Sequence, residues 1–434
     1  MADTTTVSID NVEQFKQQAL VWANAFNVVC LLDSNGYSND RYSSCEWVLA
    51  VDELSNDLTY GQEKSAQSFS ELNKQVIAGK HLFGFFTYDL KNELESLSSN
   101  HADNIGFPAM YFFEPRFLFE LRGSKLTVNR NYPETFELIE VISKCKPTDV
   151  YSATARLRCN VSKNEYVSKV QTIRQQIEEG DFYELNYCIN FSAENVELNT
   201  WQTFLKLNEC AKAPFSCYVK WHDRYLMCAS PERFLKKSGR TLIAQPIKGT
   251  NRKAGTKQLN ELQREALLNS NKEQAENVMI VDLVRNDLSK SAISGTVHVE
   301  ELFGIYTFET VNQMISTVSA QLSSDVEPVE AIKNAFPMGS MTGAPKVEVM
   351  KNIEHYESFK RGLYSGSVGY FKNGDFDFNV VIRSILYNQT TRTINVPVGG
   401  AITYDSVPVQ EYEEVLLKAQ AMFSVLGAEL LINN

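Results

Sequence analysis

Ser367-Val-Gly-Tyr-Phe371 and the two runs that follow it, Phe376 to Tyr387 and Thr393 to Val398, decide the fold class. Each run is rich in aromatic or β-branched residues, which predicts a β-strand. No helical stretch separates the runs, so the strands are expected to neighbour one another in a sheet. This arrangement argues against the strict strand and helix alternation of a doubly wound α/β fold.

The same organisation extends through the rest of the chain. Further strand-like runs are Asn27 to Leu32, Leu82 to Tyr88, Met110 to Phe113, Phe117 to Leu121, Leu185 to Phe191 and the hairpin-like region Phe215 to Phe234. Helices are predicted at Asn11 to Phe26, Asn164 to Glu179, Thr200 to Ala211, about Lys257 to Ser289, Glu330 to Phe336 and about Val409 to Leu426. Dense apolar positions from Val278 to Val284 imply that the long helix is buried on more than one face. The pattern predicts an α+β fold of mixed or antiparallel sheets flanked by helices.

The composition excludes several classes of protein. With 42 Lys and Arg against 53 Asp and Glu, the 434 residues carry a net charge of −11, which disfavours generic nucleic-acid binding. No apolar run approaches the roughly 20 residues of a membrane span, and the N-terminal residues do not resemble a signal peptide. The eight cysteines form no C-x-x-C pair, which favours reduced thiols and a cytoplasmic protein. The sequence also lacks dinucleotide-binding and P-loop motifs.

Two short acidic patterns are candidates for a metal site. Glu273 and Glu276 lie three residues apart on one predicted helix. Glu411 and Glu414 have the same spacing on the last helix, and Lys418 lies one turn further along the same face. Carboxylates that converge from two helices commonly hold Mg²⁺, which takes oxygen ligands. A solvated acidic face is the alternative, but the apolar run after Glu276 argues for burial, and a buried carboxylate needs a partner.

Lys248 is a candidate nucleophile. It lies between an apolar strand, Thr241 to Ala244, and Gly249. A lysine in an apolar site loses its proton more easily than its ordinary pKa of about 10.4 suggests, as a nucleophilic amine requires. A snorkelling lysine at a strand end is the alternative, and the residues alone leave both open.

Arg383 and a group of glycines are candidates for anion binding. Arg383 is a lone cation in a run of strand apolars, either a salt-bridged core residue or a bidentate clamp for a carboxylate. Glycines beside polar residues let backbone N–H groups approach an anion, unless they are simply turn residues. The positions of this kind that concern the site are Thr342, Tyr364, Gly399 and Gly400.

Nine motifs between Asn164 and the C-terminus resemble, in order, those of the chorismate-utilising enzymes, a family that includes anthranilate, aminodeoxychorismate, isochorismate and salicylate synthases. They are Gly180-Asp-Phe-Tyr-Glu-Leu-Asn186, Ser230-Pro-Glu-Arg-Phe-Leu235, Pro246-Ile-Lys-Gly-Thr250, Glu276 to Asp287, Phe336 to Lys346, Arg361 to Tyr370, Ile382-Arg-Ser384, Gly399-Gly-Ala401 and Glu411 to Ala419. The resemblance implies two stacked sheets, as in anthranilate synthase component I. It also implies a chorismate-binding catalytic domain at residues 160–430, with residues 1–150 as an N-terminal segment packed on it.

The lysine between Pro-Ile and Gly-Thr is similar to that of the aminodeoxychorismate synthases, whereas anthranilate and isochorismate enzymes typically have alanine there. This similarity implies amination of chorismate at C4 to 4-amino-4-deoxychorismate, a step toward p-aminobenzoate and folate. Lys248 would attack C2 of chorismate while Glu232, matching the family's general acid, protonates the departing 4-hydroxyl.

The resemblance also implies the metal and substrate contacts. The Mg²⁺ ligands would be Glu276 and Glu414, supported through water by Glu273 and Glu411. The substrate's carboxylates would meet Arg383, Tyr364, Lys418, Thr342 and the backbone of Gly399 and Gly400. Glu184, a third predicted catalytic residue, stands where relatives have Gln or a water-activating Lys. Its carboxyl is either protonated or handles ammonia, and the missing Lys argues against hydration chemistry.

The source of ammonia and two rival functions complete the expectations. None of the eight cysteines lies in the G-x-C-x-G context of a glutaminase nucleophile, so the resemblance implies a separate glutamine amidotransferase or free ammonia, and a separate lyase.

Val311-Asn-Gln-Met314 lacks the histidine of anthranilate enzymes, yet anthranilate synthase component I remains the nearest enzymatic alternative. A catalytically inactive regulator that binds chorismate or tryptophan is the second, because Leu31-Leu-Asp-Ser34 resembles a tryptophan-pocket segment.

Overall fold

The computed structural model describes residues 4–54, 58–60, 65–129, 135–146 and 154–431. Within them the strands form two sheets. Sheet A has 13 strands, in the order β1 (Thr4–Ser8), β8 (Lys125–Asn129), β7 (Pro115–Arg122), β3 (Trp47–Glu53), β2 (Val28–Asp33), β11 (Phe215–Trp221), β12 (Arg224–Ser230), β21 (Ser384–Asn388), β22 (Thr393–Ile402), β10 (Glu184–Ala193), β9 (Arg156–Cys159) and β23 (Glu429–Leu431), with β18 (Gly343–Ala344) also beside β10. Sheet B has 10 strands, in the order β15 (Ile247–Arg252), β17 (Val311–Gln321), β14 (Thr241–Gln245), β13 (Arg233–Ser238), β20 (Asp375–Asn379), β19 (Ser367–Lys372), β5 (Leu82–Phe86), β6 (Met110–Phe113) and β4 (Leu58–Tyr60), with β16 (His298–Thr307) beside β17.

The two sheets stack because sheet A is apolar on both faces. Along β2, Val28 and Cys30 belong to the core shared with sheet B, whereas Val29 and Leu31 belong to the core under the helices. Successive side chains of a strand point to opposite faces, so an unbroken apolar run covers both. Neighbouring strands are antiparallel apart from the parallel pair β9 and β23. The predicted α+β fold with two stacked, mostly antiparallel sheets is confirmed.

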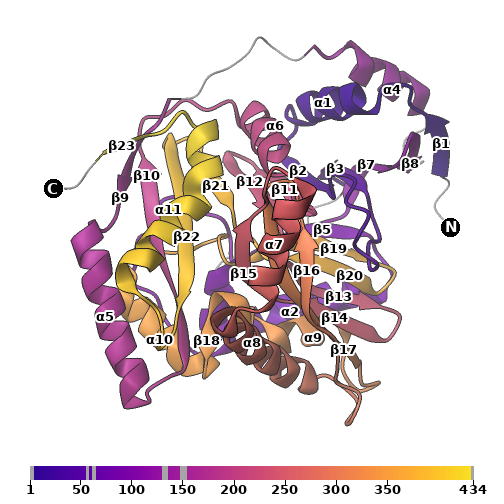
Figure 1. Cartoon of the computed structure of the whole chain (residues 1–434). Helices are drawn as coiled ribbons and strands as arrows, with labels where there is room; N and C mark the ends of the chain where they lie inside the picture. Colours follow the sequence, from indigo (N-terminus) through magenta and orange to yellow (C-terminus); the bar gives the residue numbers. More distant parts are fainter. Residues whose placement is uncertain (1–3, 55–57, 61–64, 130–134, 147–153, 432–434) are drawn as a thin grey trace.

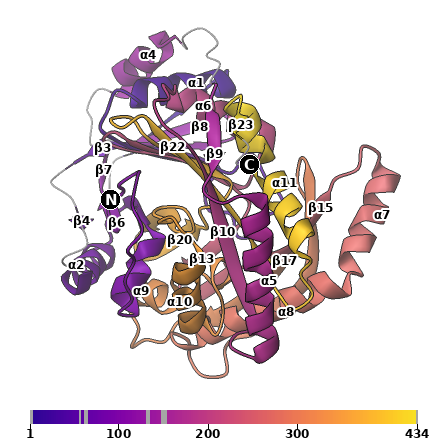
Figure 2. The same ribbon diagram turned by 90° about the vertical axis from the view of Figure 1, so that its left-hand side faces the viewer.

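Helices cover the outer face of sheet A and flank sheet B (Figure 1). In Figure 2, α5 and α11 run side by side along sheet A, and α7 lies at the far edge of the molecule. The helices are α1 (Val12–Ala23), α2 (Ser65–Ile77), α3 (Lys91–Leu94), α4 (Thr135–Lys144), α5 (Lys163–Glu179), α6 (Thr200–Ala211), α7 (Lys257–Leu268), α8 (Asn271–Ser289), α9 (Pro328–Ala335), α10 (Lys346–Tyr356) and α11 (Pro408–Val425), with short 3₁₀ turns η1 (Tyr88–Leu90) and η2 (Gly339–Met341).

The predicted single helix from about Lys257 to Ser289 is two helices. Ser270 is the N-cap of α8, and its side chain accepts a hydrogen bond from the Glu273 backbone N–H. A serine at this position satisfies a free N–H and so favours a new helix start over a continuous helix. The expected burial of the apolar run on several faces is also wrong, because Ile280 is buried while Val278 is 49% exposed.

The predicted strand from Phe376 to Tyr387 is two strands in different sheets. β20 lies in sheet B and β21 in sheet A, and the chain crosses between the sheets after Asn379. Arg383 has a φ of +52°, a left-handed conformation that interrupts extended backbone. The sequence does not reveal this crossing, because the apolar residues before the crossing and those after it are buried alike. Arg383 therefore lies at the crossing and not inside a strand.

Both halves of the chain contribute strands to both sheets. β2 pairs with β11 in sheet A, and β5 pairs with β19 in sheet B. The predicted boundary between the N-terminal segment and the catalytic domain stays a prediction, since residues 147–153 lie outside the described residues. All eight cysteines are described, and each is a free thiol, as expected. Among the described helices, none combines the length and apolar character of a membrane span.

Candidate active site

Lys248 and Glu184 form a buried ion pair at the centre of the predicted site. Lys248 is the second residue of β15, and Glu184 is the first residue of β10. The distance from Lys248 Nζ to Glu184 Oε1 is 2.5 Å, and the side chains are only 8% and 2% exposed. The structure thus joins two predicted catalytic residues that lie 64 positions apart in the sequence.

The expectation that an apolar environment lowers the pKa of Lys248 is wrong. Burial alone lowers that pKa, but the carboxylates of Glu184, Glu276 and Glu232 outweigh it and raise the pKa above its ordinary value. An opposite charge within hydrogen-bond distance favours the ammonium form. Lys248 is therefore protonated in this state, and an amine nucleophile is available only after a proton leaves.

Glu232 lies where the chain crosses from β12 in sheet A to β13 in sheet B. This crossing runs beside the one at Arg383, because Val380 N–H donates to Glu232 O (3.0 Å) and Ser230 Oγ donates to Val380 O (2.6 Å). Burial raises the pKa of the Glu232 carboxyl to about 7, against opposing effects of Ser340 and Lys248. A carboxyl group with this pKa can donate a proton near neutral pH, as a general acid must.

Two of the four predicted metal ligands, Glu276 on α8 and Glu411 on α11, lie on either side of Lys272. Lys272 Nζ lies 3.8 Å from Glu276 Oε1 and 3.5 Å from Glu411 Oε1, so one lysine links the two helices. Burial raises the pKa of Glu276 to about 7 and also raises that of Glu273. No group of three or more His, Cys, Asp or Glu side chains in the described ranges is arranged to hold a metal ion. The metal role of these glutamates stays a prediction.

Lys418 connects the acidic residues of α11 to the glycines of β22. Its Nζ lies 2.8 Å from Glu414 Oε1 and donates to Gly399 O at 3.2 Å. A Cβ on Gly400 would stand 3.6 Å from the same Nζ, whereas a Cβ on Gly399 would stand 2.3 Å from Cys188 Sγ. Glycine is therefore required at position 399 because β22 packs closely on β10. The alternative interpretation, in which Gly399 is a turn residue, is wrong.

Arg383 lies where the chain crosses from β20 in sheet B to β21 in sheet A. Burial lowers the pKa of its guanidinium, while Tyr364 and Glu414 act in the opposite direction. Within the part of the chain that the structure describes, no Asp or Glu lies within 4.0 Å of Arg383 as an ion pair. The salt-bridged core alternative is thereby excluded for the described residues, and the donors remain available to an anion.

Thr342 lies beside β10, directly after the end of η2. Its Oγ1 donates to Met338 O at 3.2 Å, and its carbonyl accepts from Asn186 N–H at 2.8 Å. These bonds fix the backbone that leads into β18, whose Ala344 pairs with Glu184. The predicted residues therefore occupy one region, formed by β10, β15, β22, α8, α11 and the two crossings.

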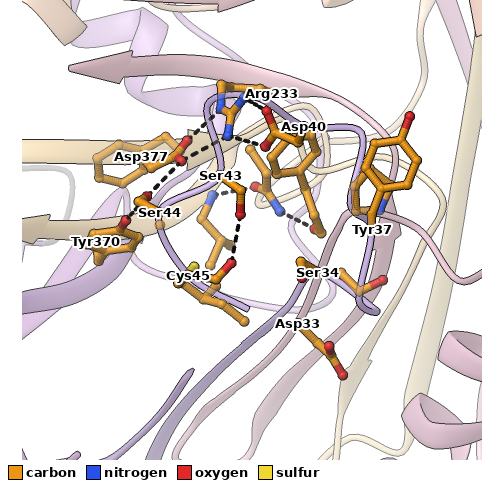
Figure 3. Close-up of a pocket in the computed structure, with 18 residues that line it drawn as sticks. Asp33, Ser34, Tyr37, Asp40, Ser43, Ser44, Cys45, Arg233, Tyr370 and Asp377 are labelled. Atoms are coloured by element: carbon orange, nitrogen blue, oxygen red, sulfur yellow. Dashed lines mark hydrogen bonds and ion pairs between the residues drawn. The ribbon is translucent and has the colours of Figure 1, made fainter. Parts of the chain in front are cut away.

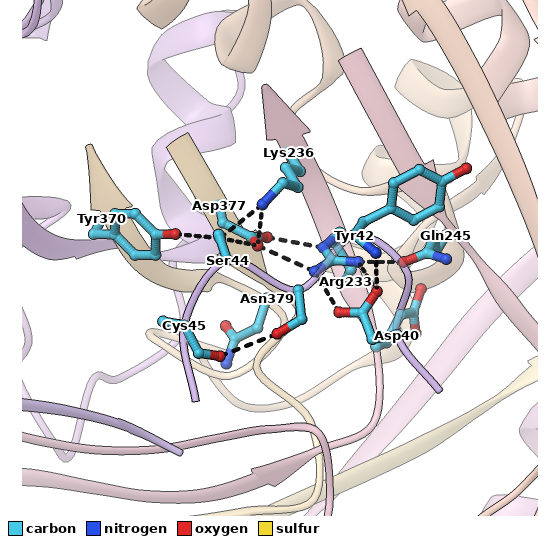
Figure 4. Close-up of polar contacts among 12 residues, drawn as sticks. Asp40, Tyr42, Ser44, Cys45, Arg233, Lys236, Gln245, Tyr370, Asp377 and Asn379 are labelled. Carbon is cyan, nitrogen blue, oxygen red and sulfur yellow. Dashed lines mark hydrogen bonds and ion pairs between the residues drawn. The ribbon is translucent and has the colours of Figure 1, made fainter. Parts of the chain in front are cut away.

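A second buried cluster, centred on Arg233, was missed in the sequence (Figure 4). Its guanidinium donates to Asp377 (Nε to Oδ1, 2.9 Å) and Asp40 (Nη2 to Oδ2, 2.7 Å), and Lys236 Nζ lies 3.2 Å from Asp377 Oδ2. The arginine of the Ser-Pro-Glu-Arg motif is the only signal of this cluster, because its two acidic partners are 193 and 144 residues away. The cluster anchors the residue that follows Glu232.

A small, partly open pocket adjoins the Arg233 cluster (Figure 3). Ser34, Tyr37, Phe215 and Tyr370 line it together with Arg233, so it has polar and aromatic walls. Among the described residues that line it, none is a predicted catalytic, substrate or metal residue.

Known proteins match almost the whole chain. A family model described as chorismate binding enzyme matches residues 28–424. Aminodeoxychorismate synthase component 1 of Salmonella typhimurium is 32% identical over 347 residues, which is 79% of this chain and 76% of that protein. The probable chloroplastic aminodeoxychorismate synthase of rice, Oryza sativa subsp. japonica, is 41% identical over 269 residues, 61% of this chain but only 30% of that protein. The chain thus spans less than a third of the rice protein's length.

Two solved structures share the fold. Anthranilate synthase component I from Streptococcus pneumoniae superposes with a TM-score of 0.73 at 24% identity, covering 86% of this chain and 91% of that chain. The menaquinone-specific isochorismate synthase of Escherichia coli gives 0.75 at 16% identity, covering 98% and 95%. At these identities the likeness shows the fold alone, and it agrees with the predicted anthranilate synthase component I-like architecture.

Proposed function

The chain belongs to the chorismate binding enzyme family, and from that premise we propose that it aminates chorismate at C4 to give 4-amino-4-deoxychorismate. The observation that carries the proposal is the buried contact between Lys248 and Glu184. The carboxylate of Glu232 also raises the pKa of Lys248. Relatives named aminodeoxychorismate synthase support this choice over anthranilate synthase component I. The product is a step toward p-aminobenzoate and folate.

The proposed reaction begins with transfer of a proton from Lys248 to Glu184, across the 2.5 Å between them. The free amine forms a bond to C2 of chorismate, the ring double bond shifts, and the C4–O bond breaks as Glu232 gives its proton to the departing hydroxyl. Ammonia then forms a bond to C4, the double bond shifts back, and the C2–N bond to Lys248 breaks. Water leaves and one ammonia is incorporated. The new C4 ammonium gives a proton to Glu232 and Glu184 returns its proton to Lys248, so all three side chains are restored.

The proposal includes Mg²⁺, held by Glu276 and Glu414 with Glu273 and Glu411 in support. Carboxylate oxygens suit this cation, and Lys272, a cation between Glu276 and Glu411, shows that positive charge is accommodated between the two helices. A cluster with this much negative charge favours a cation, although Lys272 has to move aside. When bound, the ion supplies positive charge for the ring carboxylate.

The substrate's carboxylates are assigned to the cationic and backbone groups around the crossing at Arg383. Its guanidinium has no carboxylate partner among the described residues, and it can take a carboxylate bidentately. The further proposed contacts are Tyr364, Thr342, Lys418, Gly399 and Gly400. The ammonia comes from a partner glutamine amidotransferase or from free ammonium, and eight free thiols fit a cytoplasmic location.

The test is identification of the product by mass. The protein is incubated with chorismate, Mg²⁺ and ammonium, with and without a lyase that converts 4-amino-4-deoxychorismate to p-aminobenzoate. We expect 4-amino-4-deoxychorismate alone and p-aminobenzoate with the lyase. Fluorescent anthranilate without the lyase refutes the proposal and favours the anthranilate alternative, while chorismate binding with no turnover favours an inactive regulator.

A second candidate function concerns the pocket beside Arg233. Its lining includes Ser34, the last residue of the segment that resembles a tryptophan-pocket segment, and the aromatic Tyr37 and Phe215. We propose tryptophan as its occupant, on the strength of that resemblance and of the aromatic side chains that line the pocket. Calorimetric titration with tryptophan tests this, and a Ser34→Tyr variant that still binds tryptophan with unchanged affinity contradicts it.

A further inference from the structure

We propose that the buried pair Glu357–Arg361 is a positioning device for the chorismate site, and that Arg361 holds in register the three segments that carry Glu184, Thr342 and Tyr364. Neither residue was singled out as a site residue in the sequence. The inference rests on the proposed roles of those three residues, and it adds a positioning role for two others.

The first observation is that every N–H of the Arg361 guanidinium has an acceptor. Nε and Nη2 donate to the two carboxylate oxygens of Glu357, at 2.9 and 2.5 Å. Nη2 also donates to Asn186 O at 2.9 Å, and Nη1 donates to Met341 O at 2.7 Å and to Ser365 Oγ at 3.3 Å. Five donors in a fixed planar fork thus reach four separate residues, which neither a lysine nor an apolar side chain can do.

The second observation is where these acceptors lie. Asn186 is two residues after Glu184 on β10, Met341 precedes Thr342, and Ser365 follows Tyr364. Each segment that Arg361 holds therefore carries a residue of the proposed site. If the carbonyl of Asn186 or Met341, or the hydroxyl of Ser365, shifts, the neighbouring site residue moves with it.

The third observation is that the pair completes an otherwise open edge of β10. On the side of β10 away from β22, β18 pairs at Glu184 and Leu185, and β9 pairs only from Phe191 onward. Between them, Arg361 takes up Asn186 O, and the Cys188 backbone N–H donates to Glu357 Oε1 at 2.9 Å. The ion pair thus does for this stretch what a neighbouring strand does elsewhere in the sheet.

Stability alone does not explain a charged pair here. The Arg361 and Glu357 side chains are 1% and 2% exposed, and replacing a buried ion pair with apolar groups is often neutral or stabilising. What an apolar pair lacks is the directional bonds to three segments. The geometry therefore fits a role in placing the site, where a misplacement of about 1 Å costs up to about 100-fold in rate.

The experiment compares Arg361→Lys, Glu357→Gln and a matched core control, Leu49→Ala. Leu49 is fully buried in β3, in the core under the helices, and lies outside the segments that Arg361 contacts. For each variant we measure the melting temperature, the Kd for chorismate by calorimetry, and kcat and KM with ammonium. Arg361→Lys is expected to raise the chorismate Kd at least fivefold and to lower kcat/KM about 10- to 100-fold. Glu357→Gln is expected to change both quantities in the same direction but by less. Leu49→Ala is expected to lower the melting temperature only.

A double-mutant cycle with Tyr364→Phe completes the test. If Arg361 acts through Tyr364, the combined loss of chorismate affinity is smaller than the product of the two single losses. Additive losses, or an Arg361→Lys variant that differs from wild type only as Leu49→Ala does, overturn the proposal. If Arg361→Lys does not fold, Glu357→Gln decides the question by the same measurements. The calorimetric Kd does not depend on which product forms, so failure of the proposed amination is recognised separately by product mass.

Discussion

Replacing Glu232 by Gln should abolish most activity and at the same time stabilise the protein at alkaline pH. Burial raises the pKa of the Glu232 carboxyl to about 7 from the ordinary 4.5, so folding takes up a proton at this group. Below pH 4.5 the raised pKa does not lower the free energy of unfolding. The loss of stability grows as the pH rises toward the pKa in the folded protein. Above pH 7 the buried carboxylate destabilises the native state by about 3 kcal/mol, which an uncharged amide avoids.

Urea unfolding of wild type and Glu232→Gln at several pH values measures this effect. The free energy of unfolding of the variant should exceed that of the wild type by less than about 1 kcal/mol at pH 5 and by about 3 kcal/mol at pH 8. Its turnover should fall by about 100-fold or more. Glu330→Gln, on the exposed side of α9, is the control and should show no such pH dependence. A stability difference that stays constant from pH 5 to pH 8 would refute the reasoning, because it would mean that Glu232 ionises as freely in the folded protein as in the unfolded chain.

Three further predictions concern single residues. Lys248→Ala should lower the rate of 4-amination with ammonium about 100-fold or more, and fully retained activity would show that this lysine is not the nucleophile. Gly399→Ala should destabilise the protein by about 1–3 kcal/mol in urea, since its Cβ would stand 2.3 Å from Cys188 Sγ, whereas Gly255→Ala, with open space around it, should change little. Glu276→Gln should raise the Mg²⁺ concentration for half-maximal activity about 10-fold or more, and an unchanged Mg²⁺ response would remove this glutamate from the metal site.

Regular elements were predictable from the sequence where one local pattern decides the structure. The helix predicted at Thr200 to Ala211 is the observed α6, and the strand runs near Met110 and Phe117 are β6 and β7. The failures occur where a tertiary choice competes with the pattern. Ser270 interrupts an apolar helix pattern because it caps a new helix, and Arg383 interrupts an apolar strand because the chain changes sheets there.

The candidate site was predictable as a set of residues but not as an arrangement. Motif spacing singled out Lys248 and Glu184 separately, yet their contact depends on the approach of β15 in sheet B to β10 in sheet A. The sign of the pKa change at Lys248 follows from that contact and was therefore predicted wrongly from the apolar run alone. The carboxylate partners of Arg233 could not be found at all, because only the folded chain brings them to it.

The position of β21 and β22 in sheet A has a consequence for how the chain is made. These strands, from residues 384–402, lie between β12 and β10, which leave the ribosome much earlier. At about 5–20 residues per second, the interval between Ser230 and Ile402 lasts on the order of 10–30 s, during which two long strand edges have no partner. Unpaired edges of this kind favour aggregation. Sheet A is therefore completed only after residues 384–402 have been synthesised, and a chaperone that shields these edges should increase the yield of folded protein.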